Sequence, residues 1–256
     1  MQLELNINGY LSQVMLMPKE VNEVYKPLLK RISHLRNKQT KSKRTKILLA
    51  GPPGSGKSTF ASVLEELAHQ QKTFSVQALG LDGFHFKNTY LRSNFISYNG
   101  KELTLEAIKG APETYDIKSL LKQWQLLDKP NAQWPVYDRT LHEPVSDKIV
   151  LKSEVLLLEG NWVLLDEENW RVLSAQADLT IFLRAGEEQV CERLKARKKR
   201  GGFSLEEVEA HYLRTDKPNV NRVLTKSLPA DLELIWTTDT EPSQLAFRAS
   251  QDLDII

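Results

Sequence analysis

The chain has 256 residues, of which 41% are hydrophobic, and a formal net charge of +2 at pH 7. These values allow one large domain with a substantial core, and the small net charge gives no support for a nucleic-acid partner. A single cysteine, Cys191, excludes an intrachain disulfide and a cysteine-based zinc site. No apolar run reaches membrane-spanning length and the first residues lack signal-peptide features, so we expect a cytoplasmic protein without a membrane partner.

Residues 1–45 predict an extension in front of the main domain. Apolar and polar residues alternate on both sides of Asn8-Gly9, a dipeptide that favours a hairpin turn. A helix is expected to begin near Pro18. The basic segment 36–46 could contact nucleic acid or an acidic partner, but a solvated connector is the more common role of such a segment.

Residues 51–58, GPPGSGKS, fit the GxxxxGK[ST] pattern of a phosphate-binding loop. A triphosphate requires several backbone N–H groups that point at one centre, and glycines permit that approach. Apolar residues before the loop predict a strand, and helical spacing after it predicts a helix. This context disfavours an incidental glycine-rich turn. The residues expected to bind the nucleotide are Gly51, Pro52, Pro53, Gly54, Ser55, Gly56, Lys57, Ser58 and Thr59.

Two side chains of this loop have separate expected roles. Lys57 would supply positive charge to the β- and γ-phosphates, and Ser58 would offer its hydroxyl to Mg²⁺. The helix that begins here would also direct the positive end of its dipole toward the phosphates.

Strand-like and helical segments alternate after the loop. We expect strands at 47–50, 74–81, 155–158, 179–183 and 232–236, and helices at 117–127, 167–175, 187–199 and 205–214. This alternation predicts an α/β fold in which helices cover both faces of a parallel sheet and the ligand lies at the carboxyl ends of the strands. Asp82 and Glu159 both follow such strands, so we expect them beside the phosphate loop.

Asp82 is the candidate catalytic base. A carboxylate near the γ-phosphate could accept the proton of an acceptor hydroxyl or hold that hydroxyl in line. The alternative is a carboxylate that caps an Asp-Gly turn. Asp82 and Glu159 are also candidate Mg²⁺ ligands with Ser58, although Glu159 could instead fix a neighbouring loop.

Two segments, 110–116 and 134–144, predict a pocket for a polar small molecule. They combine aromatic rings with Asp, Arg and His side chains, which is typical of such pockets. Turn chemistry could explain either segment alone, but the two together favour a pocket. The candidate substrate contacts are His85, Glu113, Tyr137, Asp138, Arg139 and His142, and His85 could equally form a hydrogen-bonding wall.

These motifs, in this order, resemble those of the phosphoribulokinase, uridine kinase and pantothenate kinase group of P-loop kinases. Within the group the chain looks closest to a bacterial branch labelled nucleoside/nucleotide kinase or fructose-transport-system kinase, over nearly its whole length. The resemblance implies five parallel strands in the order 2-3-1-4-5, ATP as the phosphoryl donor and Asp82 as the base. It also implies a mobile lid with arginines near the phosphates.

The lid is expected around residues 193–216. Arg193 and Arg197 would neutralise charge on the transferred phosphoryl group, and Gly201-Gly202 could act as a hinge, whereas a basic helix without this resemblance would be read as a solvated surface. Asp216 and Asn219 could close over the site or simply end a helix.

The substrate segment departs from the uridine kinases at one position. Tyr137 and His142 match their Tyr-Asp-Phe-x-x-His segment, but Arg139 stands in place of the phenylalanine. This difference disfavours a nucleoside, and a guanidinium would suit an acidic or phosphorylated acceptor.

The sequence thus predicts a kinase domain, residues 46–256, that uses ATP and Mg²⁺ to phosphorylate a hydroxyl of a small metabolite. Nucleosides, sugars, sugar acids and pantothenate-like alcohols are the candidate acceptors, and a homodimer is left open. The alternative is a P-loop ATPase or ATP-dependent switch that acts on a macromolecular partner.

Overall fold

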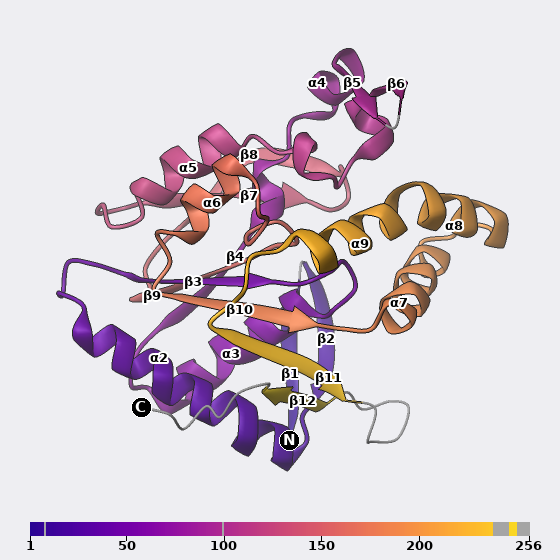
Figure 1. Cartoon of the computed structure of the whole chain (residues 1–256). Helices are drawn as coiled ribbons and strands as arrows, with labels where there is room; N and C mark the ends of the chain where they lie inside the picture. The colour runs from indigo at the N-terminus through magenta and orange to yellow at the C-terminus, as the bar shows by residue number, and fades with distance from the viewer. Residues whose placement is uncertain (8, 99, 238–245, 250–256) are drawn as a thin grey trace.

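The computed structural model describes residues 1–7, 9–98, 100–237 and 246–249, and its centre is one six-stranded sheet (Figure 1). The strands lie in the order β12-β11-β10-β3-β9-β4. Five of them are parallel, and β12 runs antiparallel to β11 at one edge. Their bounds are β3 Thr45–Ala50, β4 Val76–Gly80, β9 Val155–Glu159, β10 Leu179–Arg184, β11 Leu232–Thr237 and β12 Ala246–Ala249.

The parallel part of the sheet confirms the predicted fold. In chain order its strands are β3, β4, β9, β10 and β11, so their spatial order corresponds to 2-3-1-4-5. Each begins and ends within two residues of the predicted position. The antiparallel strand β12 was not predicted and extends the sheet beyond β11.

Successive residues of β3 face opposite layers, because side chains alternate along a strand. Ile47 and Leu49 belong to the core on the side of α2 (Lys26–Lys38) and α3 (Lys57–Gln71). Leu48 and Ala50 belong to the core on the side of α5 (Ile117–Gln125) and α6 (Glu168–Ser174), which cover the other face in Figure 1. Burial on both faces explains why this strand is a continuous apolar run.

The N-terminal extension forms the predicted hairpin and helix. Strands β1 (Gln2–Ile7) and β2 (Tyr10–Met15) pair antiparallel, and Asn8 of the predicted turn lies outside the described residues. A continuous helical run follows, made of α1 (Pro18–Glu20), a π-helical turn at Val21–Tyr25 and α2. Leu3 and Leu5 share one apolar core with α2 and α3, so the extension packs directly against the sheet layer.

The basic segment that follows is not a fully solvated connector. Helix α2 continues to Lys38, and Arg36 forms an ion pair with Glu154 at 2.6 Å. The guanidinium of Arg44 donates hydrogen bonds to the carbonyl oxygens of Leu151 and Ser153. Both arginines therefore anchor the segment to the edge of the main domain, and only the residues between them are exposed.

Two hairpins project from the carboxyl edge of the sheet and were not predicted. The first forms an arm with α4 (Asn88–Ser93), β5 (Phe95–Tyr98) and β6 (Lys101–Thr104), and it has a small core of its own around Leu91 and Leu105. The second is β7 (Gln133–Asp138) paired with β8 (Glu143–Val150). This second hairpin contains the predicted substrate segment 134–144.

The helical region after β10 is longer than predicted. It contains α7 (Glu187–Arg200), α8 (Leu205–His211), a π-helical turn at Tyr212–Asp216 and α9 (Lys217–Lys226). Helix α9 was not predicted; Pro218 lies in its first turn, where proline is well tolerated.

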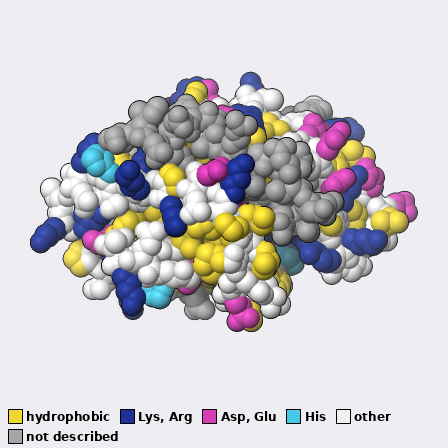
Figure 2. All heavy atoms as spheres, turned by 90° about the horizontal axis from the view of Figure 1, so that it is seen from below, with side chains coloured by type: hydrophobic (Ala, Val, Ile, Leu, Met, Phe, Trp, Pro, Cys, Tyr) yellow, Lys and Arg dark blue, Asp and Glu magenta, His cyan; other side chains and the backbone are white. Residues whose placement is uncertain are grey.

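The face seen from below in Figure 2 has an apolar area near its centre, with Lys and Arg side chains spread around it. Among the described side chains visible there, the basic ones do not gather into a stripe of the kind that binds nucleic acid. No helix in the described part of the chain is long and apolar enough to cross a membrane.

Candidate functional site

The phosphate loop lies between the end of β3 and the start of α3, as predicted. Its glycines are required because a side chain at these positions would clash with neighbouring atoms. A Cβ on Gly51 would lie 2.5 Å from the carbonyl oxygen of Leu183, and one on Gly56 would lie 2.8 Å from the ring of Trp236. Gly54 and Gly56 also have φ values of +79° and +91°, which favour glycine. The first N–H groups of α3 have no acceptor within the helix and are available to an anion. The loop therefore fits a nucleotide phosphate chain.

Lys57 is buried at the base of this loop. Its ammonium donates to the carbonyl oxygens of Gly51 and Pro52 and, at 2.7 Å, to Oδ1 of Asn161. Burial lowers the pKa of Lys57 from 10.5 to about 8, and the charges of Glu159 and Asp82 oppose that shift. A buried ammonium held by neutral oxygens is well suited to donate hydrogen bonds to phosphate oxygens.

Ser58 and Glu159 lie side by side, as expected for two ligands of one cation. Oγ of Ser58 donates to Oε1 of Glu159 at 2.6 Å. Burial raises the pKa of Glu159, and the nearby Lys57 ammonium opposes this effect. Within the described residues no three acidic, His or Cys side chains form a metal cluster. One hydroxyl and one carboxylate are nevertheless a suitable partial set for Mg²⁺, which usually takes its other oxygens from water and phosphate.

Asp82 lies in a single 3₁₀ turn, Leu81–Phe84, directly after β4. Its Oδ1 accepts a hydrogen bond from the hydroxyl of Tyr115 at 3.2 Å, and its Oδ2 accepts one from the guanidinium of Arg139 at 3.0 Å. Nε2 of His85 lies 3.9 Å from Oδ1. The carboxylate is thus held by side chains from two distant segments and does not cap its own turn.

His85 is a buried wall of this cluster. Its ring stacks on Tyr115 with centroids 3.8 Å apart and lies 5.7 Å from the ring of Tyr137. Nδ1 lies 3.2 Å from the carbonyl oxygen of Thr114. Burial lowers the pKa of His85, and Asp82 opposes that shift. We therefore expect a neutral ring at pH 7.

The structure brings together only part of the predicted substrate set. His85, Tyr137 and Arg139 surround Asp82, whereas Glu113 pairs with Arg222 at 2.7 Å. Oδ1 of Asp138 accepts from the backbone N–H groups of Thr140 and Leu141, so it caps its own turn. His142 is exposed in the same turn, with a φ of +53°. These contacts give Glu113 and Asp138 structural partners of their own, away from the Asp82 cluster.

The two predicted lid arginines occupy different places. Arg193 donates to the carbonyl oxygen of Gly54 at 3.3 Å, and its guanidinium lies 4.0 Å from the ring of Trp236. Arg197, one turn further along α7, interacts electrostatically with Asp216, Arg139 and Asp82. Arg193 therefore contacts the rim of the phosphate loop, and Arg197 lies close enough to Asp82 and Asp216 to interact with both electrostatically.

Neither Asp216 nor Asn219 ends a helix. Asp216 lies 3.7 Å from His211 within the continuous run from α8 to α9, and Asn219 is buried in α9. The helix-end alternative for both residues is therefore wrong.

Sequence reasoning missed several side chains at this site. Asn161, two residues after Glu159, carried no predicted role, and Tyr115 was only one of the aromatic residues of segment 110–116. Trp236 donates its indole N–H to the carbonyl oxygen of Ser55 at 2.6 Å. Its position at the end of the predicted strand 232–236 was the available signal, because ligand contacts gather at strand ends.

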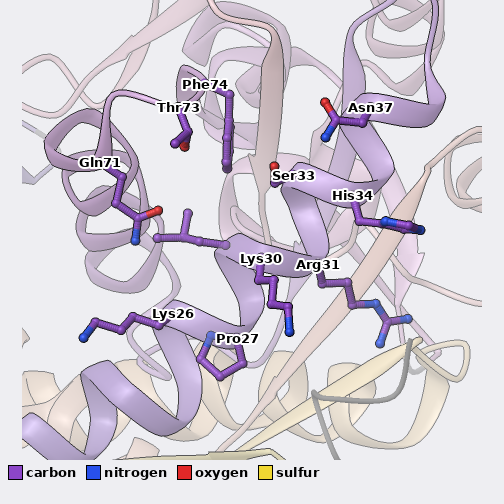
Figure 3. A pocket seen from close by; sticks show the side chains of 11 residues that line it. Lys26, Pro27, Lys30, Arg31, Ser33, His34, Asn37, Gln71, Thr73 and Phe74 are labelled. Atoms are coloured by element: carbon purple, nitrogen blue, oxygen red, sulfur yellow. The ribbon is translucent and has the colours of Figure 1, made fainter.

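A separate pocket of about 360 Å³ lies between α2 and the segment after α3 (Figure 3). It is lined by basic side chains that include Lys26, Lys30, Arg31 and His34. In Figure 3 Lys26 extends away from Arg31 and His34, so these groups do not converge on one point. The pocket borders Gln71 at the far end of α3, about 20 Å from the phosphate loop at 1.5 Å per residue. It is too distant to hold the acceptor.

A phosphate loop after the central strand β3, with Glu159 at the end of the neighbouring strand β9 and Asp82 after the next strand, β4, defines a P-loop kinase of the phosphoribulokinase, uridine kinase and pantothenate kinase group. The chain belongs to the family described as the AAA domain, which matches residues 47–214. It is 38% identical to the protein YggC of Escherichia coli K12 over 240 residues, or 93% of this chain and 97% of YggC.

Relatives with assigned activities are more distant. The uridine kinase of Lactobacillus johnsonii is 29% identical over 187 residues, which cover 72% of this chain and 82% of that enzyme. A crystal structure from Silicibacter sp. TM1040, assigned as a fructose transport system kinase, superposes with a TM-score of 0.71 at 27% identity. It covers 82% of this chain and 98% of the other. These relatives support a small-molecule kinase and leave its acceptor undetermined.

Proposed function

We propose that this protein uses ATP and Mg²⁺ to transfer a γ-phosphate to a hydroxyl of a small metabolite. The observation that carries the proposal is the position of Asp82. It follows the strand at the edge of the parallel sheet, is held by Tyr115 and Arg139, and acts electrostatically on both Lys57 and Glu159. A P-loop protein that only hydrolyses or senses ATP does not need a carboxylate held among aromatic rings beside its phosphate site.

The donor side of the reaction would use the loop and α3. The backbone N–H groups of residues 54–59 would bind the β- and γ-phosphates, and Lys57 would exchange its carbonyl partners for phosphate oxygens. Ser58 and Glu159 would hold Mg²⁺, which would screen the phosphate charge. Arg193 would bind at the rim of the loop.

The acceptor side would use Asp82 and the two hairpins. Asp82 would accept the proton of the hydroxyl as the oxygen attacks phosphorus, and Tyr137 and His85 would form the wall behind the acceptor. Arg197 interacts electrostatically with Asp82 and would be the arginine of the lid that neutralises charge on the transferred phosphoryl group. Residues 46–256 would form this kinase domain, with 193–216 as its lid, in the cytoplasm.

A panel assay tests the proposal. ADP release and phosphorylated product would be measured with ATP and Mg²⁺ against nucleosides, sugars, sugar acids and pantothenate. We expect at least one compound to raise ADP release with stoichiometric formation of product. If no compound is phosphorylated, while a protein or nucleic acid stimulates hydrolysis, the protein is an ATP-dependent switch and the proposed function is wrong.

A further inference from the structure

We propose that the acceptor is a hydroxy compound that carries an oxyanion, a carboxylate or a phosphate, and that Arg139 and Lys109 bind this group. The inference rests on the proposed function, because it names the class of molecule that enters the same site.

Arg139 binds an oxygen of the Asp82 carboxylate, the group that would accept the proton in the reaction. Its Nη2 lies 3.0 Å from Oδ2 of Asp82, while Oδ1 of Asp82 already accepts the Tyr115 hydroxyl. Each carboxylate oxygen keeps a second lone pair, but a guanidinium bound to a carboxylate stabilises the charged form and weakens it as a base. Release of Arg139 in the productive complex would therefore favour proton transfer to Asp82.

The structure allows that movement. Arg139 directly follows β7 at the start of the hairpin turn, and its side chain is 34% exposed. A guanidinium released from one carboxylate in a partly buried site requires another partner, because an unpaired charge there is unfavourable. An oxyanion on the acceptor would provide this partner, and a guanidinium can donate two parallel hydrogen bonds to such a group.

Lys109 supplies a second positive charge nearby. Its ammonium donates to Oδ1 of Asn88 at 2.7 Å and to the carbonyl oxygen of His142. Both partners are neutral, and among the described residues no carboxylate lies within ion-pair distance of this ammonium. The acids that act on it from further away are already engaged, since Glu143 accepts from the backbone of Asn88 and Glu106 pairs with Arg92.

Lys109 and Arg139 both lie near the aromatic ring of Tyr137. The ammonium of Lys109 lies 5.6 Å, and the guanidinium of Arg139 6.0 Å, from the ring centre of Tyr137. The same ring lies 5.7 Å from His85, which borders Asp82. An acceptor lying on Tyr137 would therefore reach Asp82 with its hydroxyl and the two cations with its anionic end.

Binding of matched pairs of compounds tests this directly. With AMP-PNP and Mg²⁺ in the nucleotide site, calorimetry would compare glycerate with glycerol, pantothenate with panthenol, and sugar phosphates with their free sugars. We expect at least one anionic member to bind ten times or more tightly than its neutral partner. Comparison of the carboxylate pairs with the phosphate pairs shows whether the site prefers a carboxylate or a phosphate.

The substitutions Arg139→Gln and Lys109→Gln should each reduce that preference about tenfold or more. Lys101→Gln, which removes an exposed cation from β6 of the same arm, serves as the matched control and should leave the preference unchanged. Equal binding of the two members of every pair, binding of none of them, or a preference that survives both substitutions would overturn the inference.

The binding measurements test the anion site and the turnover assay tests the kinase proposal, so either proposal can fail without the other. An anionic compound that binds through Arg139 but is never phosphorylated would contradict the kinase proposal and support the anion site. Turnover of neutral compounds, with no preference for their anionic partners, would support the kinase proposal and contradict the anion site.

Discussion

Oγ of Ser58 donates a hydrogen bond to Oε1 of Glu159 at 2.6 Å, although the two residues lie 101 positions apart in the chain. Parallel pairing of β3 with β9 brings them together, because the phosphate loop follows one strand and Glu159 ends the other. The bond joins the two side chains for which we propose Mg²⁺ binding, and it occupies a carboxylate whose pKa is raised by burial.

The substitution Glu159→Gln should raise the Mg²⁺ concentration required for half-maximal activity at least tenfold. The amide keeps the size of the side chain and the Ser58 contact, but it lacks the negative charge that attracts the ion. Titration of activity with Mg²⁺ at saturating ATP would measure this, with Glu66→Gln, which changes a partly exposed acid of α3, as the control. An unchanged Mg²⁺ requirement would remove Glu159 from the metal site.

The substitution Asp82→Asn should leave nucleotide affinity within about twofold and reduce transfer by roughly 10²- to 10⁴-fold, the usual contribution of a general base. Asparagine can still accept the Tyr115 hydroxyl at 3.2 Å, so the local structure should persist. Nucleotide binding and single-turnover rates would be compared with those of Asp166→Asn, an exposed acid paired with Arg171. Equal transfer rates in Asp82→Asn and the parent protein would exclude Asp82 as the base.

Nucleotide affinity should weaken as the pH rises above 8. The pKa of Lys57 is lowered to about 8, so its ammonium is charged below that pH and neutral above it in the free protein. Phosphate binding requires the charged form, so Kd should increase about tenfold between pH 7 and pH 9, because each pH unit above the pKa costs 1.36 kcal/mol. Lys57→Arg, which stays charged, should flatten the profile over this range. A flat profile in the parent protein would contradict the predicted shift.

The substitution Gly51→Ala should destabilise the protein by about 1–3 kcal/mol, the usual range for overpacking, and weaken nucleotide binding. The added Cβ would meet the carbonyl oxygen of Leu183 in β10, a strand hydrogen-bonded on both sides that cannot easily move. Gly80→Ala is the matched control, since no atom lies within 4 Å of its ideal Cβ. Thermal unfolding and nucleotide binding would be measured for both. Equal stability of the two variants would show that the loop tolerates a side chain at position 51.

Local sequence patterns were sufficient for the parallel strands, for the hairpin and helix of the N-terminal extension, and for the phosphate loop. Continuous apolar runs and helical spacing report burial directly, and the loop requires glycine at set positions whatever surrounds it. The same patterns failed for the hairpin β7–β8 and for α9. Proline interrupts the alternation in the first, and Pro218 at the start of the second resembles a helix end.

The partners of the acidic and basic side chains could not be predicted, because they depend on which distant segments fold against one another. Asp82 faces Arg139 from 57 positions away, Lys57 binds Asn161 from 104 positions away, and Trp236 binds Ser55 from 181 positions away. Residue type alone gave Glu113, Asp138 and Arg139 the same predicted role. In the folded chain Glu113 pairs with Arg222, Asp138 accepts from the backbone of its own turn, and only Arg139 lies beside Asp82. Each charged group binds the opposite charge or N–H group that the packing of the chain brings within reach.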